Sequence, residues 1–117
     1  MADDIQITEI ESGAHARVLR ISGRLDAKNA QALVGRCHEL RDRGTTNVIV
    51  NLKEISFVAS SGIGSLLALT ETFKDANGAL RLVELSSAVS SVVEILNLGQ
   101  FLEIAATEDE ALAAIGV

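Results

Sequence analysis

An almost continuously apolar stretch, NVIVNL at 47–52, places the tightest limit on how this chain can fold. A strand with so few polar residues is typical of the interior of a parallel sheet that is covered on both faces. Apolar residues at helical spacing follow it, at Ile63, Leu66, Leu67, Thr70 and Phe73. A buried strand followed by an amphipathic helix predicts a repeating unit of a layered α/β fold.

The patterns before this unit predict a hairpin and a helix. Two β-rich runs, 5–10 and 15–21, are separated by ESGA, which indicates a turn at Gly13. Asp26 is well placed as the N-cap of the helix that follows, and Gly44 marks its end after Arg41 and Arg43. The apolar face of this helix consists of Ala30, Leu33, Val34, Cys37 and Leu40.

The patterns after it predict a strand at 79–85, a helix, a short strand at 101–104 and a last helix that opens at Thr107. The apolar face of the first of these helices consists of Val89, Val92, Val93 and Leu96. We therefore expect one α/β domain over residues 1–117, with a single mixed, mostly parallel β-sheet begun by a β-hairpin and helices packed on it.

Charge and composition exclude several classes of protein. The chain has 16 Asp and Glu residues against 10 Lys and Arg, so its formal net charge is −6, and we expect no nucleic-acid partner. No apolar run reaches the roughly 18 residues of a membrane helix, so no membrane insertion is expected. The N-terminus, MADDIQITEI, lacks signal-peptide features, and a lone Cys37 forms no internal disulfide. These features indicate a cytoplasmic protein, and the chain shows no metal-ligand spacing and no cofactor motif.

The segment FVASSGIG, 57–64, ends the buried strand at the edge of the sheet where ligands and partners of α/β proteins gather. Neither a phosphate-binding G-x-x-x-x-G-K-[ST] loop nor a G-x-S-x-G nucleophile motif is present, and neither His15 nor His38 is placed beside a serine. We therefore expect no enzyme. The residues alone leave two roles open: Ser60 or Ser61 caps the helix while the glycines permit close packing, or one hydroxyl accepts a phosphate.

Three stretches resemble a known family: LRISGRLDAKNAQAL (19–33), NVIVNLKEISFVASSGIGSLLAL (47–69) and GALRLVELSSAVSSVVEILNLG (78–99). They are similar to the STAS domains, and among them to the stand-alone anti-sigma factor antagonists. The resemblance implies partner switching. The unphosphorylated protein binds an anti-sigma factor, which is also a serine kinase of the histidine-kinase-like ATPase type, and so frees the sigma factor. Phosphorylation of a loop serine releases the complex, and a serine phosphatase reverses the modification.

The resemblance also implies the site. It places the phosphorylated residue at Ser60, with Ser61 as second choice. The implied partner-binding surface consists of Asp26, Val58, Ala59, Ser60, Ser61, Gly62, Ile63 and Gly64, with Val58 and Ile63 as apolar contacts. The family usually has an aspartate where this chain has Ala59. Two alternatives are a STAS subunit of a signalling scaffold or lipid-transport complex without a phosphorylation switch, and a small nucleotide-binding protein.

Overall fold

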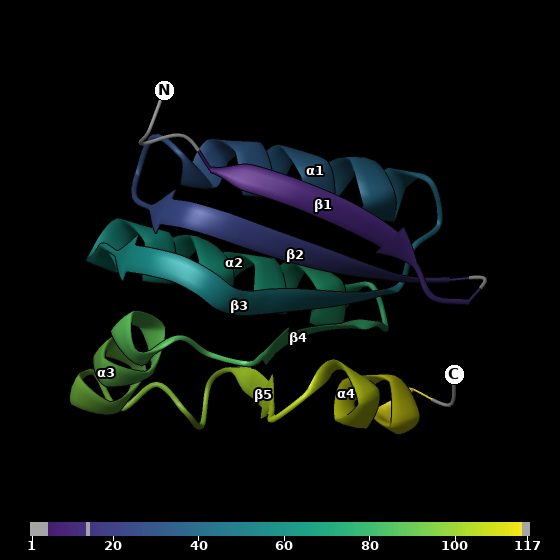
Figure 1. Cartoon of the computed structure of the whole chain (residues 1–117). Coiled ribbons are helices and arrows are strands. Elements are labelled where there is room, and N and C mark those ends of the chain that lie inside the picture. Colours follow the sequence, from purple (N-terminus) through teal and green to yellow (C-terminus); the bar gives the residue numbers. More distant parts are fainter. Residues whose placement is uncertain (1–4, 14, 116–117) are drawn as a thin grey trace.

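Five strands form one sheet whose spatial order, β1-β2-β3-β4-β5, is also the order of the chain (Figure 1). The structure is a computed structural model and describes residues 5–13 and 15–115. The first pair of strands is antiparallel and the other pairs are parallel. The predicted fold class is thereby confirmed. Residues 1–4, which carry part of the expectation about a signal peptide, lie outside the described residues.

Strands and helices alternate after the initial hairpin. The strands are β1 (Gln6–Glu11), β2 (Ala16–Leu25), β3 (Asn47–Val58), β4 (Ala79–Val83) and β5 (Glu103–Ala105). The helices are α1 (Ala30–Asp42), α2 (Ser60–Asp75), α3 (Ser87–Ile95) and α4 (Glu108–Ala114). Every predicted element is present, but β2 and β3 extend four and six residues beyond their predicted ends, to 25 and 58. Both run past shifts of register, which interrupt the pattern by which a strand is recognised in a sequence.

The main core lies between the sheet and the first three helices, which share one face (Figure 1). Its helical members include Leu33, Leu66, Phe73 and Val89, as their spacing predicts. Leu96 is the exception among the predicted core residues, because it follows the end of α3 and is 48 % exposed. No described helix is both long enough and apolar enough to span a membrane.

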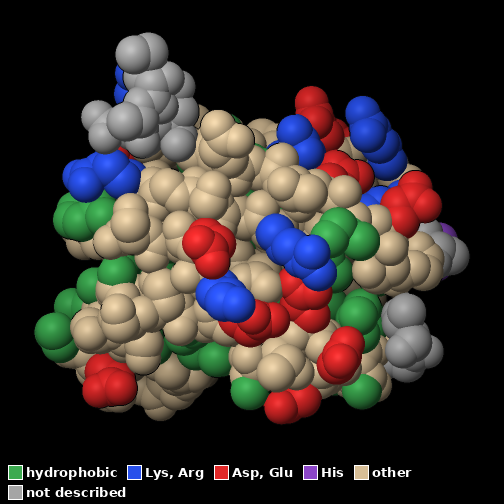
Figure 2. All heavy atoms as spheres, viewed as in Figure 1, with side chains coloured by type: hydrophobic (Ala, Val, Ile, Leu, Met, Phe, Trp, Pro, Cys, Tyr) green, Lys and Arg blue, Asp and Glu red, His purple; other side chains and the backbone are tan. Residues whose placement is uncertain are grey.

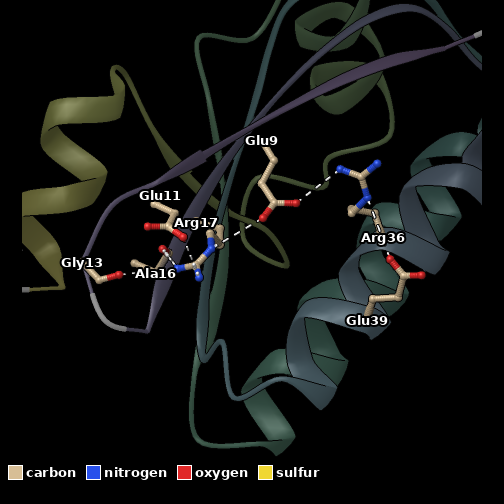
Figure 3. Close-up of polar contacts among 7 residues, drawn as sticks. All are labelled: Glu9, Glu11, Gly13, Ala16, Arg17, Arg36 and Glu39. Carbon is tan, nitrogen blue, oxygen red and sulfur yellow. Dashed lines mark hydrogen bonds and ion pairs between the residues drawn. The ribbon is translucent and has the colours of Figure 1, made fainter.

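The first strand is held to α1 by a carboxylate that two arginines share (Figure 3). Glu9 on β1 lies 3.5 Å from Nε of Arg17 on β2 and accepts a hydrogen bond from Nη1 of Arg36 on α1 at 3.3 Å. Each partly exposed ion pair contributes little alone. The bridge nevertheless links three elements, β1, β2 and α1, through one carboxylate.

The opposite face of the sheet is covered in part by α4, which begins after Thr107 caps it. Figure 2 shows this face, with acidic and basic side chains gathered near α4. Glu108 accepts two hydrogen bonds from Arg20, both of 2.9 Å, and one from Nδ2 of Asn51 at 2.6 Å. The hydrogen bonds from Arg20, with that from Asn51 adding to them, lower the pKa of Glu108.

Glu108→Gln therefore should lower the melting temperature at pH 7. A carboxylate with a lowered pKa in the folded state stabilises the fold above its ordinary pKa, and this contribution is lost as the pH falls through the lowered value. The difference in melting temperature between the variant and the wild type should become smaller as the pH falls through this lowered pKa. Asp109→Asn, an exposed acid in the same first turn, is the matched control for the helix dipole. Thermal unfolding by circular dichroism between pH 3 and pH 7 tests the assignment, which equal effects of the two variants would contradict.

Candidate functional site

The serine loop joins the end of β3 to the start of α2. Ala59 has extended backbone angles and is the N-cap residue, so Ser60 and Ser61 are the first two residues of the helix itself. No side chain caps this helix end, and the expectation that one of the serines does so is wrong. Both serines are exposed. The fold therefore does not use either hydroxyl as a cap.

The end of β2 fixes the position of this loop. The backbone N–H of Ala59 donates to the carbonyl oxygen of Leu25 at 2.9 Å, and Leu25 pairs with Val58 across the strands. A Cβ atom on Gly62 would lie 2.3 Å from the same carbonyl oxygen, which is closer than atoms can approach. The predicted close packing is confirmed for Gly62. It is absent at Gly64, where a Cβ would meet nothing within 4 Å.

Asp26 lies at the same edge, because it follows Leu25 as Ala59 follows Val58. Its Oδ1 accepts the backbone N–H of Asn29 at 2.9 Å, and its backbone carbonyl accepts that of Ala30 at 2.9 Å. The prediction that Asp26 is the N-cap of α1 is wrong, because Asn29 takes that position. Asp26 instead caps the turn that precedes the helix. Its side chain is half-buried and remains partly accessible beside the serine loop.

Three of the predicted partner-binding residues are not on the surface: Val58, Gly62 and Ile63. Val58 is 7 % exposed and Ile63 is 2 % exposed, and both belong to the main core. Their side chains hold the loop and cannot present apolar surface to a partner without being pulled out of the core. Ala59 is half-buried, and Ser60, Ser61 and Gly64 are exposed.

The sequence pattern also missed an exposed aromatic residue at this edge. Phe57 is 40 % exposed, and the guanidinium carbon of Arg24 lies 4.2 Å from the centre of its ring. Alternation counted from the buried Ile55 would have turned Phe57 inward, since residues 55 and 57 share one side of a regular strand. The missing information was the extra residue of β3, Ser56, which lies between these two positions and has no partner on β2.

The electrostatic potential at the serine loop is set by the start of α2, whose first turn contains no acidic side chain. The first turn of α2 contains no acidic residue, so its free N–H groups give a positive potential near the serines. Histidines are placed elsewhere: His15 precedes β2 at its other end, and His38 lies in the second half of α1. Among residues 5–13 and 15–115, no group of three or more His, Cys, Asp or Glu side chains could hold a metal ion.

A hollow of about 350 Å³ lies elsewhere, on the sheet face beside α4. Its polar lining is formed by Arg20, Asn51, Lys53, Glu54, Glu84 and Glu108. None of these residues belongs to the serine loop. The site at 57–64 is therefore an exposed edge outside this hollow, which suits contact with a protein surface better than enclosure of a small molecule.

The model of the STAS domain family matches residues 5–111, and the chain belongs to this family. Over 94 residues it is 26 % identical to BtrV of Bordetella bronchiseptica, whose assigned role is that of an anti-sigma factor antagonist, covering 80 % of this chain and 81 % of BtrV. The unphosphorylated form of the anti-sigma factor antagonist SpoIIAA superposes with a TM-score of 0.78 at 25 % identity, over 94 % of this chain and 96 % of SpoIIAA.

Two further structures share the fold. The phosphorylated form of SpoIIAA from Bacillus has a TM-score of 0.72 at 23 % identity, over 94 % of this chain and 99 % of that chain. An anti-sigma factor antagonist from Mycobacterium paratuberculosis has a TM-score of 0.84 at 22 % identity, over 98 % of this chain and 97 % of that chain. The fold thus extends over nearly the full length of each protein.

Gly62→Ala should destabilise the protein by about 1–3 kcal/mol, because the added methyl group meets a backbone carbonyl that cannot move away freely. Gly64→Ala, two residues further along the same helix, should be neutral or stabilising by up to about 1 kcal/mol, since it has open space and alanine favours the helix. Urea unfolding measures both. Similar free energies of unfolding for the two variants would show that the close approach to Leu25 is not a constraint.

Proposed function

We propose that this protein is an anti-sigma factor antagonist that acts by partner switching, with Ser60 as the phosphorylated residue. One observation carries the proposal: the hydroxyl of Ser60, the first residue of α2, is exposed and does not cap the helix. Membership of the STAS family and similarity to anti-sigma factor antagonists support it. Ser61, the next exposed residue of the helix, is the second choice as phosphate acceptor.

The unmodified edge is suited to bind a protein. Ser60 and Ser61 present small polar side chains, and Asp26 adds one carboxylate from the adjoining strand end. A partner that covers these groups has few charges to desolvate. The surface that we propose for the anti-sigma factor consists of the exposed or partly exposed residues Asp26, Ala59, Ser60, Ser61 and Gly64.

Phosphorylation changes the charge of this edge more than its shape. A phosphoserine adds about −1.5 to −2 charges and three acceptor oxygens. At the first residue of α2 the free N–H groups and the helix dipole accommodate an anion, so the free protein keeps its fold. In a complex, the same group beside Asp26 would be buried against a partner arranged for a neutral hydroxyl. Leaving such a charge unpaired is strongly unfavourable.

Ala59 stands where related proteins usually have an aspartate, so recognition by the kinase depends on other residues. Asp26 is the carboxylate that remains at this edge, one residue beyond the Leu25–Val58 pair. We propose that the anti-sigma factor, a serine kinase of the histidine-kinase-like ATPase type, docks against Asp26 when it modifies Ser60. A serine phosphatase restores the binding form, and all of these partners are cytoplasmic.

Ser60→Asp should weaken binding to the anti-sigma kinase by about a hundredfold or more, whereas Ser60→Ala should bind as tightly as the wild type and resist release by ATP. The kinase is first identified by affinity purification with the full chain and mass spectrometry, then purified for titration calorimetry. Ser87→Asp is the matched control, because Ser87 is likewise the exposed first residue of a helix, α3.

Phosphopeptide mapping after incubation with the kinase and ATP identifies the modified residue directly. We expect phosphate on Ser60. Phosphate on another residue with Ser60 unmodified, or equal loss of binding in Ser60→Asp and Ser87→Asp, would contradict the proposal. Recovery of a transporter or scaffold protein, with no ATPase, would favour the alternative role of a STAS subunit in a larger assembly.

A further inference from the structure

The pairing of β2 with β3 contains an extra residue just before the serine loop. Gly23 pairs with Ile55, and the next residue, Arg24, pairs with Phe57, so Ser56 has no partner across the strands. The hydroxyl of Ser56 donates to the carbonyl oxygen of Gly23 at 3.2 Å, and Gly23 has a φ of 109° that suits only glycine. This is a β-bulge, a feature that commonly lies next to functional sites and redirects a side chain.

The bulge decides which side chains face solvent at the end of β3. Along a regular strand, Phe57 would share the buried side of Ile55 and Val58 would face outward. In this protein Phe57 is 40 % exposed, while Val58 is 7 % exposed. An irregular backbone with a glycine in a left-handed conformation therefore places the larger apolar side chain outside and the smaller one inside, which is the reverse of what burial of apolar surface favours. The bulge therefore leaves an aromatic side chain exposed at the end of β3.

Arg24 lies over the exposed ring, with its guanidinium carbon 4.2 Å from the ring centre. A stacked guanidinium keeps its N–H groups directed outward in its own plane, where they can bind a carboxylate. Across residues 5–13 and 15–115, no ion pair involves Arg24. The Arg24–Phe57 platform thus combines exposed aromatic surface with a cation that has no carboxylate partner among the residues that the structure describes.

We propose that the Arg24–Phe57 platform is a second docking point for the anti-sigma factor, which meets Phe57 with an apolar side chain and Arg24 with a carboxylate. The inference rests on the proposed function. The platform adjoins the serine edge, because Leu25 and Val58 separate it from Asp26 and Ala59 by one pair of residues. One partner surface can therefore cover both. Figure 2 shows hydrophobic and basic side chains together at the left end of the molecule, where β2 and β3 end.

The charge of the platform favours a different protein over a second copy of this chain. A two-fold axis through the platform would bring the Arg24 guanidinium groups of both copies together, and like charges repel at such short range. A partner with a carboxylate beside an apolar group satisfies both halves of the platform. Aromatic and arginine side chains are also the residues that most often dominate the binding energy of protein interfaces.

Phe57→Ala should raise the Kd for the purified anti-sigma kinase by about tenfold or more, since a half-exposed aromatic ring at an interface centre is typical of an energetic anchor. The matched control is Phe101→Ala, because Phe101 is another exposed phenylalanine, 59 % exposed, near the distant edge strand β5. It should leave the Kd unchanged. Calorimetric titrations of the full-length variants, with melting temperatures recorded for each, measure both effects. Equal Kd values for the two variants would overturn the proposal.

Charge variants test the chemistry of the partner. Arg24→Gln should weaken binding several-fold and reduce its salt dependence, and Arg24→Glu should weaken it further, because a carboxylate would then face a carboxylate. Arg43→Glu, at the exposed end of α1, is the control for net charge. Tighter binding of Arg24→Glu would show that the partner has a cation at this place and would overturn the proposal. So would a dimer of this protein that Phe57→Ala dissociates.

The same titrations separate this inference from the proposed function. If the wild type binds the kinase, Ser60→Asp does not, and Phe57→Ala binds normally, then partner switching holds and the platform is not a docking point. If the wild type binds no kinase of this type, both proposals fail. Phe57→Leu keeps apolar surface while removing the ring, so partial recovery of affinity in this variant excludes a general loss of folding as the cause.

Discussion

The pairing of Leu25 with Val58 is the interaction on which the site depends. It brings the ends of two parallel strands together, and the carbonyl oxygen of Leu25 then accepts the N–H of Ala59 and lies against Gly62. Asp26 emerges from the same point and organises the turn before α1. A single backbone contact therefore sets the start of two helices and the distance between a carboxylate and the serine loop.

Much of this fold could be predicted from the sequence, because apolar periodicity records which face of each element is buried. The continuous apolar run at 47–52 predicted a central strand. The predicted N-cap, Asp26, lies in the turn before α1, and Asn29 takes the N-cap position. The strand ends could not be predicted. A bulge such as that at Ser56 depends on how two strands pair, and this information is not local to either strand.

The site illustrates the same division between local and non-local information. A serine before a helix is a good capping candidate by type, yet the backbone of Ala59 takes the cap position and leaves Ser60 inside the helix. Apolar residues beside the serines could be recognised as apolar, but only the pairing of β2 with β3 decides that Val58 is buried and Phe57 is not. The resemblance to STAS domains identifies the loop at 57–64. The register of the sheet determines which of its side chains are exposed.

The serine hydroxyls lie at the start of α2 but do not take part in capping it. Ser60 and Ser61 follow the N-cap residue, and neither side chain supports the end of α2. In the proposed function, a phosphate on Ser60 therefore changes the charge of this edge without removing a hydrogen bond that caps α2. Repeated cycles of the proposed phosphorylation and dephosphorylation would then need no partly unfolded intermediate, which is the form that proteases cleave.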